Sequence, residues 1–321
     1  MIAKLSKRAT ALGATAALVG AFLAGCSSSS SGASPLAPGA PQSAGSVTVG
    51  SDNFSESVLL AEIYGQALAA KGYKVSYKLN LASREVTYGL LRSGAISLKP
   101  EYNGALLAYL DSVNKTSSPQ TSTDQVDSAI TAELASNLEI LKPAAAQDND
   151  TLTLTKAEAA KLNLKPGATI SQFVTALNGQ PVTIGAAPEF QTRTQGIVGL
   201  EQSYGLKASQ ITLKSLDAGG TLTETALTQG AVDAGDLFTT DPTIAQGSLL
   251  TLVDNKNIFG LQNVLPLANK ASLTPAGVDA LNAVDAKLDS ATLLSLDVKV
   301  QTAKQDPQAV ASQWLKSQGL V

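Results

Sequence analysis

Hydrophobic and polar positions follow the periods of strands and helices from Val47 onward. The β-branched run Val47–Ser51 predicts a short strand. Apolar residues then recur at helical spacing over positions 58–68, and Gly72 is suited to end that helix. Positions 73–81 alternate strictly between apolar and polar, which predicts a strand with one buried face. A second helix is expected over Arg84–Arg92.

The same alternation continues toward the C-terminus. A helix is predicted over Thr123–Asn137. Four further strands are predicted, with helical stretches between them: Leu152–Thr155, Val182–Ala186, Ile211–Ser215 and Val232–Phe238. Helix starts are expected at Thr274-Pro275 and Asp306-Pro307, where an N-cap residue precedes a proline. Strands that alternate with helices indicate an α/β fold, and two groups of strands favour two lobes over one sheet.

The first helix carries its own start signal. Asn53 and Glu56 stand three residues apart, as in a capping box, although Asn replaces the usual Ser or Thr.

The first 46 residues predict export and anchoring rather than a folded domain. Basic residues precede an uncharged apolar stretch over positions 9–25, which is typical of a signal peptide. The stretch ends in Leu-Ala-Gly-Cys26, which resembles the lipobox of bacterial lipoproteins and implies that Cys26 is lipidated after residues 1–25 are removed. Positions 26–46 are rich in Ser, Gly, Ala and Pro and predict a flexible linker. The alternative is one membrane-spanning anchor, for which the apolar stretch is marginal in length.

The composition excludes several kinds of chemistry. The 321 residues contain no His, and Cys26 is the only Cys. Serine–histidine and cysteine–histidine catalysis, His-ligated zinc and an internal disulfide are therefore excluded, and we expect no cofactor and no metal. The 23 basic and 26 acidic residues give a net charge of −3, so nothing favours nucleic acid as a partner.

Several strings in the body resemble one family when they are taken together. The strings are VGSDNFSE (49–56), LAEIY (60–64), KGY (71–73), NLASREV (80–86), PEYNG (100–104), APEFQTR (187–193) and DLFTTD (236–241). In this order and at these distances they resemble the substrate-binding proteins of osmoprotectant ABC importers, which take up glycine betaine, choline and related quaternary amines. The resemblance covers essentially all of Val47–Val321.

The resemblance implies the type II-like fold of periplasmic binding proteins, with two α/β lobes, a hinge and a ligand cleft between the lobes. Lobe 1 is expected over residues 47–145 and 243–321, and lobe 2 over residues 146–242. The hinge crossings are expected at Gln147–Asn149 and Thr239–Asp241. The expected protein is a monomer without enzymatic activity, which binds a small molecule and delivers it to an ABC permease with its ATPase.

The predicted ligand-binding residues come from these strings and from the hinge. They are Asp52, Asn53, Phe54, Arg84, Tyr102, Asn103, Gln147, Asp148, Phe190, Glu224, Thr239, Thr240 and Asp241. Tyr102 matches a position of the tyrosine cage that holds trimethylammonium groups in the family, because a cation without N–H donors is recognised by π faces. Arg84 is suited to clamp a ligand carboxylate.

Several of these residues also have an ordinary structural interpretation. Asn53 can cap a helix and Phe54 can staple it. Arg84 can form a salt bridge with Glu85, Glu101 or Glu189. The segment Thr239–Asp241 can cap the helix that begins at Pro242.

The chain departs from the family at other cage positions. Alignment with the full tyrosine cage places Ala144–Ala146, Ile197 and Glu224 there, which predicts weak glycine betaine binding. Phe190 and acidic residues such as Asp52 and Glu224 are the expected substitutes. Two other functions stay open: a lipoprotein enzyme of the cell envelope, and a ligand-sensing or non-transport lipoprotein that binds a different polar or aromatic compound.

Overall fold

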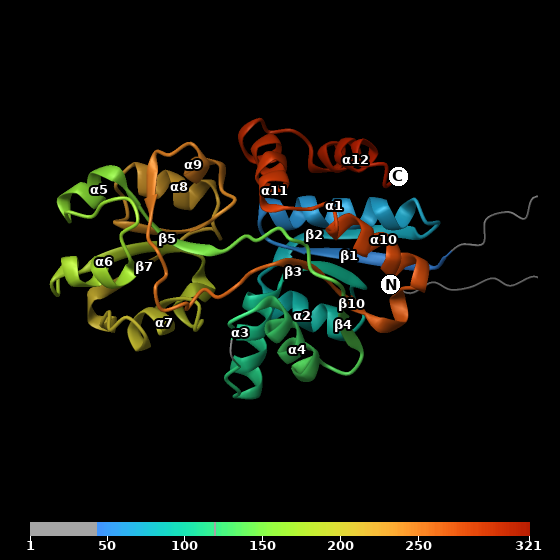
Figure 1. Cartoon of the computed structure of the whole chain (residues 1–321), viewed down its shortest axis with the longest axis horizontal. Coiled ribbons are helices and arrows are strands. Elements are labelled where there is room, and N and C mark those ends of the chain that lie inside the picture. The colour runs from blue at the N-terminus through green and yellow to red at the C-terminus, as the bar shows by residue number, and fades with distance from the viewer. Residues whose placement is uncertain (1–43, 119) are drawn as a thin grey trace, which may run out of the picture. The chain divides into compact units, whose positions relative to one another are not determined.

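Two five-stranded sheets form the framework of the body, and helices cover both (Figure 1). The computed structural model describes residues 44–118 and 120–321. The predicted signal peptide, Cys26 and nearly all of the predicted linker lie outside the described residues.

The first sheet has the strand order β2-β1-β3-β10-β4. Its strands are β1 (Ser46–Asp52), β2 (Lys74–Ala82), β3 (Leu98–Tyr102), β4 (Leu138–Ile140) and β10 (Val264–Asn269). β1 runs parallel to β2 and β3, whereas β10 runs antiparallel to β3 and β4.

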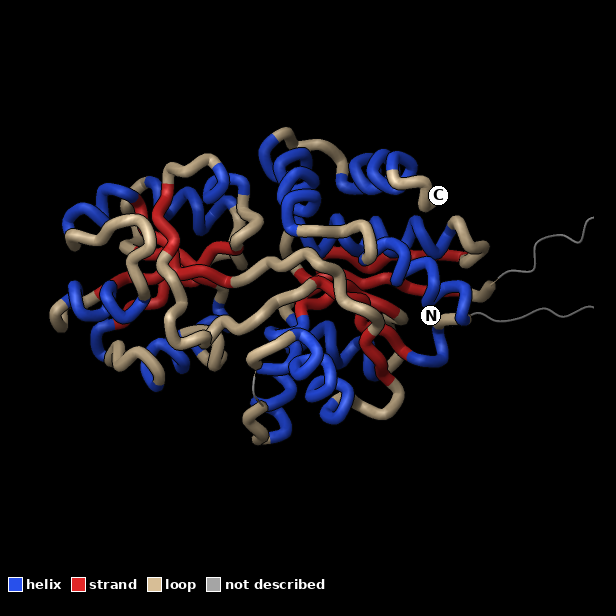
Figure 2. Tube along the Cα trace, viewed as in Figure 1, coloured by secondary structure: helices blue, strands red, loops and turns tan. Residues whose placement is uncertain are grey.

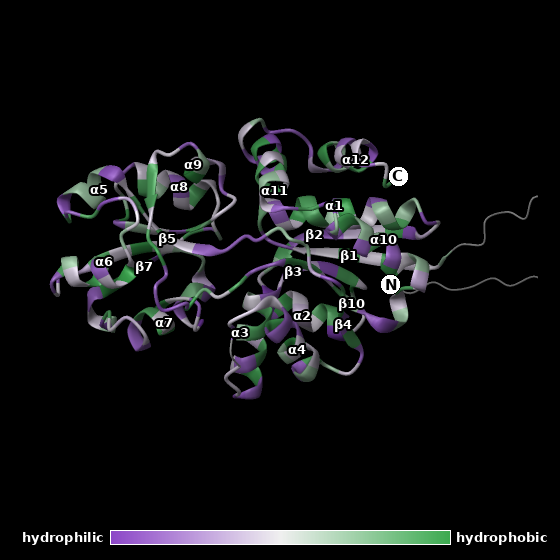
Figure 3. Ribbon diagram, viewed as in Figure 1, coloured by the Kyte–Doolittle hydropathy of each residue, from purple (hydrophilic) through white to green (hydrophobic). Residues whose placement is uncertain are grey.

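Helices cover both faces of this sheet. The helices associated with it are α1 (Ser55–Ala69), α2 (Arg84–Arg92), α3 (Asn103–Asn114), α4 (Thr123–Glu133), α10 (Pro275–Asp285), α11 (Ser290–Asp297) and α12 (Pro307–Ser317), with short turns η3 (Lys270–Ser272) and η4 (Val298–Thr302). One core packs α1, α10 and α12 against β1, and a second core packs α2, α3 and α4 against the opposite face. Figure 3 shows α1 as a largely hydrophobic helix, which fits its position between the sheet and α12.

The second sheet has the strand order β7-β6-β8-β5-β9. Its strands are β5 (Asp150–Thr155), β6 (Val182–Ala186), β7 (Ile211–Ser215), β8 (Ala234–Phe238) and β9 (Leu249–Thr251). Its helices are α5 (Lys156–Lys161), α6 (Ile170–Leu177), α7 (Ile197–Gln202), α8 (Thr221–Thr228) and α9 (Pro242–Ala245), with turns η1 (Pro188–Gln191) and η2 (Ala208–Gln210). β6 is parallel to β7 and β8, and β5 is antiparallel to β8 and β9.

Two chain segments join the sheets (Figure 2). The outgoing segment passes through Gln147–Asn149, as predicted, and the returning segment immediately precedes β10. Gln147 and Asn263 form an isolated antiparallel bridge, and Asp148 N donates a hydrogen bond of 3.1 Å to Gln262 O. The chain thus returns to the first sheet later than predicted, because β9 still pairs with β5. Thr239–Asp241 is no crossing: it links β8 to α9 within the second lobe.

The local start signals of the helices had mixed outcomes. α10 and α12 begin at Pro275 and Pro307, as predicted, and the preceding Thr and Asp cap them through their side chains. The capping box at the first helix was wrong. α1 begins at Ser55 with Phe54 at the N-cap and no side-chain cap, and the Glu56 carboxylate is buried in contacts described below.

Candidate functional site

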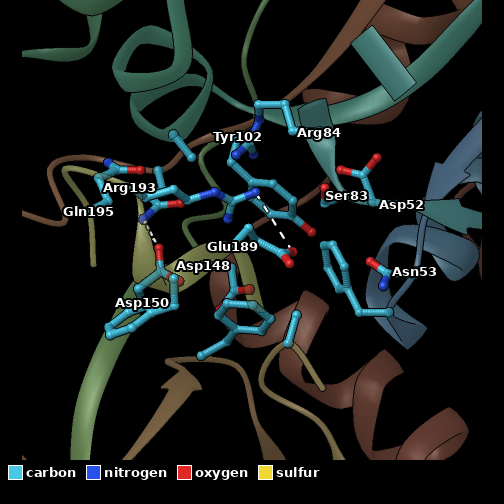
Figure 4. A pocket seen from close by; sticks show the side chains of 16 residues that line it. Asp52, Asn53, Ser83, Arg84, Tyr102, Asp148, Asp150, Glu189, Arg193 and Gln195 are labelled. Carbon is cyan, nitrogen blue, oxygen red and sulfur yellow. Dashed lines mark hydrogen bonds and ion pairs between the residues drawn. The ribbon is translucent and has the colours of Figure 1, made fainter. Parts of the chain in front are cut away.

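A pocket lies where strands of both sheets end. It encloses about 570 Å³ (Figure 4). The residues that line it are Asp52, Asn53, Phe54, Ser83, Arg84, Tyr102, Ala105, Asp148, Asp150, Glu189, Phe190, Arg193, Gln195, Ala218, Phe238 and Gln262. The carboxyl ends of β1, β3, β6 and β8 lead into this set. Small ligands bind at this edge in open α/β sheets.

Most of the predicted ligand-binding residues come together here. Seven of them line the pocket: Asp52, Asn53, Phe54, Arg84, Tyr102, Asp148 and Phe190. Thr240 and Asp241 line an adjoining cavity of about 500 Å³, which shares Asn53, Phe54 and Phe238 with the pocket.

Four predicted residues line neither the pocket nor the adjoining cavity. Asn103 Oδ1 accepts hydrogen bonds from the N–H groups of Gly104 and Asn263, so this side chain fixes the start of α3 against the returning segment. Gln147 and Thr239 line a separate cavity. Glu224 accepts a hydrogen bond from Thr243 Oγ1 and lies outside both cavities.

Aromatic rings from both sheets gather in the pocket. The centroid of Phe54 lies 6.0 Å from that of Tyr102 and 5.5 Å from that of Phe238, and Phe190 also lines the pocket. The Phe238 ring rests on Gly219, whose φ is +60° and where an added Cβ would lie 2.4 Å from a ring carbon. Gly219 therefore has both a conformational and a steric reason to be glycine.

The aromatic residues are not those expected from the tyrosine cage. Ala144 and Ala146 lie in the core that packs α1 against β1, and Ile197 lies in the core of the second lobe. None of these three residues lines the pocket, and neither does Glu224. Phe238, at the end of β8, was missed because nothing in its local pattern separates a ligand contact from a core residue. The residues expected at the other cage positions therefore do not contribute to this pocket.

A buried charge network supports one side of the pocket. Lys99 Nζ lies 2.7 Å from Asp52 Oδ1 and 2.9 Å from Glu101 Oε1, and Arg84 Nη2 lies 2.9 Å from Glu101 Oε2. Burial alone would raise the pKa of Glu101, but Arg84 and Lys99 lower that pKa to about 2. Asp52 is thus neutralised by Lys99 and is no free acceptor for a cation. Arg84 forms the salt bridge with Glu101 that was its alternative interpretation, and it lines the pocket as well.

A second arginine comes from the other lobe. Arg193 Nε and Nη2 each donate a hydrogen bond of 3.0 Å to the carboxylate of Glu85 on α2. Partial burial raises the pKa of Glu85, but the contact with Arg193 outweighs it and lowers that pKa to about 2. Glu101 engages Nε and Nη2 of Arg84 in the same way. Among the described residues, the Nη1 amino groups of both arginines therefore keep donors for a ligand.

Buried carboxyl groups without a basic partner lie on the aromatic side. Glu56 accepts hydrogen bonds from Tyr102 OH and, at 2.7 Å, from Thr240 Oγ1, so it links the two lobes. Asp148 accepts a hydrogen bond of 3.0 Å from Thr240 N. Burial, together with the neighbouring Asp297, raises the pKa of Glu56 well above its usual range, and burial with the neighbouring Glu56 does the same for Asp148. Sequence reasoning missed Glu56 because it lies inside a helix-start motif.

Within residues 44–118 and 120–321, no helix has the length and apolarity to cross a membrane. In the same part of the chain, no three His, Cys, Asp or Glu side chains gather in a way that would hold a metal ion.

Two lobes with mixed five-stranded sheets, two joining segments and a polar and aromatic pocket between them define a periplasmic binding protein of the type II-like fold. Residues 45–317 match the model of the family described as the substrate binding domain of ABC-type glycine betaine transport systems. The chain belongs to this family, which confirms the resemblance found in the sequence. Members of the family are extracytoplasmic proteins that bind a small ligand and work with a permease and an ATPase.

Individual relatives resemble the chain over nearly its whole length. The glycine betaine-binding protein YehZ of Escherichia coli is 28% identical over 285 residues, which cover 87% of this chain and 92% of YehZ. A glycine-betaine-binding protein of Pseudomonas aeruginosa is 26% identical and covers 85% of this chain and 88% of its own. The solved structure of apo YehZ from Escherichia coli superposes with a TM-score of 0.58 at 25% identity and covers 86% of this chain and 99% of that one.

Proposed function

We propose that this chain captures a small zwitterionic quaternary amine of the glycine betaine type and delivers it to an ABC permease. The observation that carries the proposal is the gathering of Phe54, Tyr102, Phe190 and Phe238 around one pocket. A quaternary ammonium group has no N–H donor, so π faces and nearby negative charge are its main attractions in a protein. The names of the Escherichia coli and Pseudomonas aeruginosa relatives support the same ligand class.

The pocket offers different chemistry at its two sides. Figure 4 shows Asp52 and Asn53 on one side and Arg193 and Gln195 on the other. The ring of Phe54, which follows Asn53, contacts the rings of Tyr102 and Phe238. We place the ammonium group among these rings, beside the carboxyl group of Asp148, and the ligand carboxylate at the Nη1 groups of the two arginines. Arginine suits this task because its planar donors match a carboxylate.

The remaining expectations form part of the same proposal. The protein is a binding protein without turnover, works as a monomer, and is held at the outer face of the cytoplasmic membrane by a lipid on Cys26. Closure of the lobes brings Phe54 and Phe238 onto the ligand from opposite sides, since one ring follows β1 and the other ends β8.

A pair of isosteres tests the proposal. Glycine betaine and 3,3-dimethylbutanoate have nearly the same shape and the same carboxylate, but only glycine betaine carries a cation. Titration calorimetry on the purified protein should show glycine betaine bound at least about fivefold more tightly, because two or more ring faces contribute about 0.5–2 kcal/mol each. Equal affinities, or no binding of glycine betaine and choline at millimolar concentration, would refute the assignment.

A further inference from the structure

Besides the cavity lined by Thr240 and Asp241, another cavity adjoins the pocket, on the side of Arg84 and Arg193; we call it the second cavity. It encloses about 690 Å³ and shares Arg84, Ala105, Arg193 and Gln195 with the pocket. Both lobes line it: α3 contributes from the first lobe, and the segment between η1 and α7 contributes from the second. The two cavities therefore adjoin at the arginines.

The two arginines mark the boundary between the cavities. Glu101 and Glu85 hold them in place through Nε and Nη2. A carboxylate bound at the remaining Nη1 groups lies at this boundary. In an amino acid betaine, the carbon that bears the carboxylate also bears the ammonium group and any side chain. With the ammonium among the rings, the second cavity is the open space on the carboxylate side into which that side chain can extend.

The lining of the second cavity shows which side chains fit. Ala105, Ala108 and Ser112 recur at three- and four-residue spacing, so small residues form the floor along one face of α3. Tyr109 and Val113 add apolar surface beside them, and the exposed fraction of Val113 is 58%. No acidic residue except Glu85 lines this cavity, and Glu85 is paired with Arg193. The lining thus suits an apolar or aromatic group rather than a second cation.

We propose that this second cavity is a subsite for the side chain of the ligand, so that the protein prefers N-trimethylated amino acids with a bulky apolar or aromatic side chain over glycine betaine. The inference rests on the proposed function, because it uses the same positions for the ammonium and carboxylate groups. It adds a ligand class, α-substituted amino acid betaines, and names the residues of α3 that select it.

The test compares two ligands on three forms of the full chain by titration calorimetry. The probes are glycine betaine and N,N,N-trimethyl-L-phenylalanine. The wild-type protein should bind the second probe at least about tenfold more tightly, since burying about half of a phenyl ring corresponds to a gain of that order. The Ala108→Leu variant fills the floor of the subsite and should lose about tenfold for the aromatic probe, while its affinity for glycine betaine changes less than about threefold.

A matched substitution controls for general effects of a larger helix residue. Ala276 is exposed at the start of α10, so Ala276→Leu should leave both affinities unchanged. If glycine betaine binds and the aromatic probe binds equally or more weakly, the subsite is wrong and the proposed function stands. If neither probe nor choline binds, the proposed function itself is wrong. Equal losses for both probes in Ala108→Leu would also overturn the subsite.

Discussion

The buried carboxyl of Asp297 should make the free energy of unfolding depend on pH. Asp297 ends α11 and is fully buried, and neither of its oxygens has a hydrogen-bond partner of good geometry among the described residues. Burial, with the repulsion of Asp148 and Asp241, raises the pKa of Asp297 from its ordinary value of 3.8 to about 8, although contacts with Glu56 and Gln301 oppose the rise. We predict that Asp297→Asn makes the protein more stable than the wild type at alkaline pH.

The direction follows from proton binding. Between pH values of about 4 and 8, the folded protein holds a proton on Asp297 that the unfolded chain releases. The free energy of unfolding therefore falls as the pH rises through this range. A pKa difference of about 4 units corresponds to at most about 6 kcal/mol, and about 4 kcal/mol is already lost at pH 7. An asparagine amide cannot ionise, so the variant avoids this loss. The buried amide costs about 1–3 kcal/mol at every pH.

Urea unfolding of the wild type and of Asp297→Asn at pH values from 5 to 9 measures the effect. The variant should be equal to the wild type or slightly less stable at pH 5, and about 2–4 kcal/mol more stable at pH 8.5. Asp279→Asn, at an exposed position of α10, is the control and should show no such crossover. A difference between variant and wild type that stays constant from pH 5 to 9 would refute the reasoning.

Three further predictions concern binding and location. Phe238→Leu keeps apolar volume but removes a π face, so glycine betaine should bind about 2- to 30-fold more weakly by calorimetry. An unchanged affinity would show that Phe238 does not contact the ligand. Glu85→Gln breaks the half-exposed contact with Arg193 between the lobes, so ligand affinity should fall by at most about fivefold. Small-angle scattering should show a larger ligand-free molecule, and an unchanged scattering curve would contradict a link between the lobes through this pair. Cys26→Ser should release the protein from the membrane fraction without unfolding it, and a variant that stays in that fraction after signal cleavage would contradict the lipid anchor.

Local patterns predicted most of the elements. The alternation over residues 73–81 became β2, the predicted helix Arg84–Arg92 matches α2 to the residue, and β6 and β7 have their predicted bounds. These elements depend on neighbours in sequence, where periodicity and Gly or Pro signals act. Thr123–Asn137 was predicted too long, since α4 ends at Glu133 and the chain then turns into β4.

The site was predictable only in part, because its contacts join distant segments. Tyr102 and Arg84 were found through motifs that resemble a family. The contact of Glu56 with Thr240 spans 184 positions and that of Arg193 with Glu85 spans 108, and no pattern within a window of the sequence carries such information. Phe238 could not be predicted from the sequence for the same reason, because its proximity to Phe54 depends on how the two sheets meet.

The position of β10 has a consequence for the order in which the two lobes can form during synthesis. All five strands of the second sheet lie between residues 150 and 251, so a nascent chain contains every strand of that lobe before β10 is made. The first sheet begins earlier in the chain but stays incomplete, because β4 has no partner until residues 264–269 insert between it and β3. The lobe that is translated first is therefore completed last, and until then its unpaired strand edges are available to chaperones and proteases.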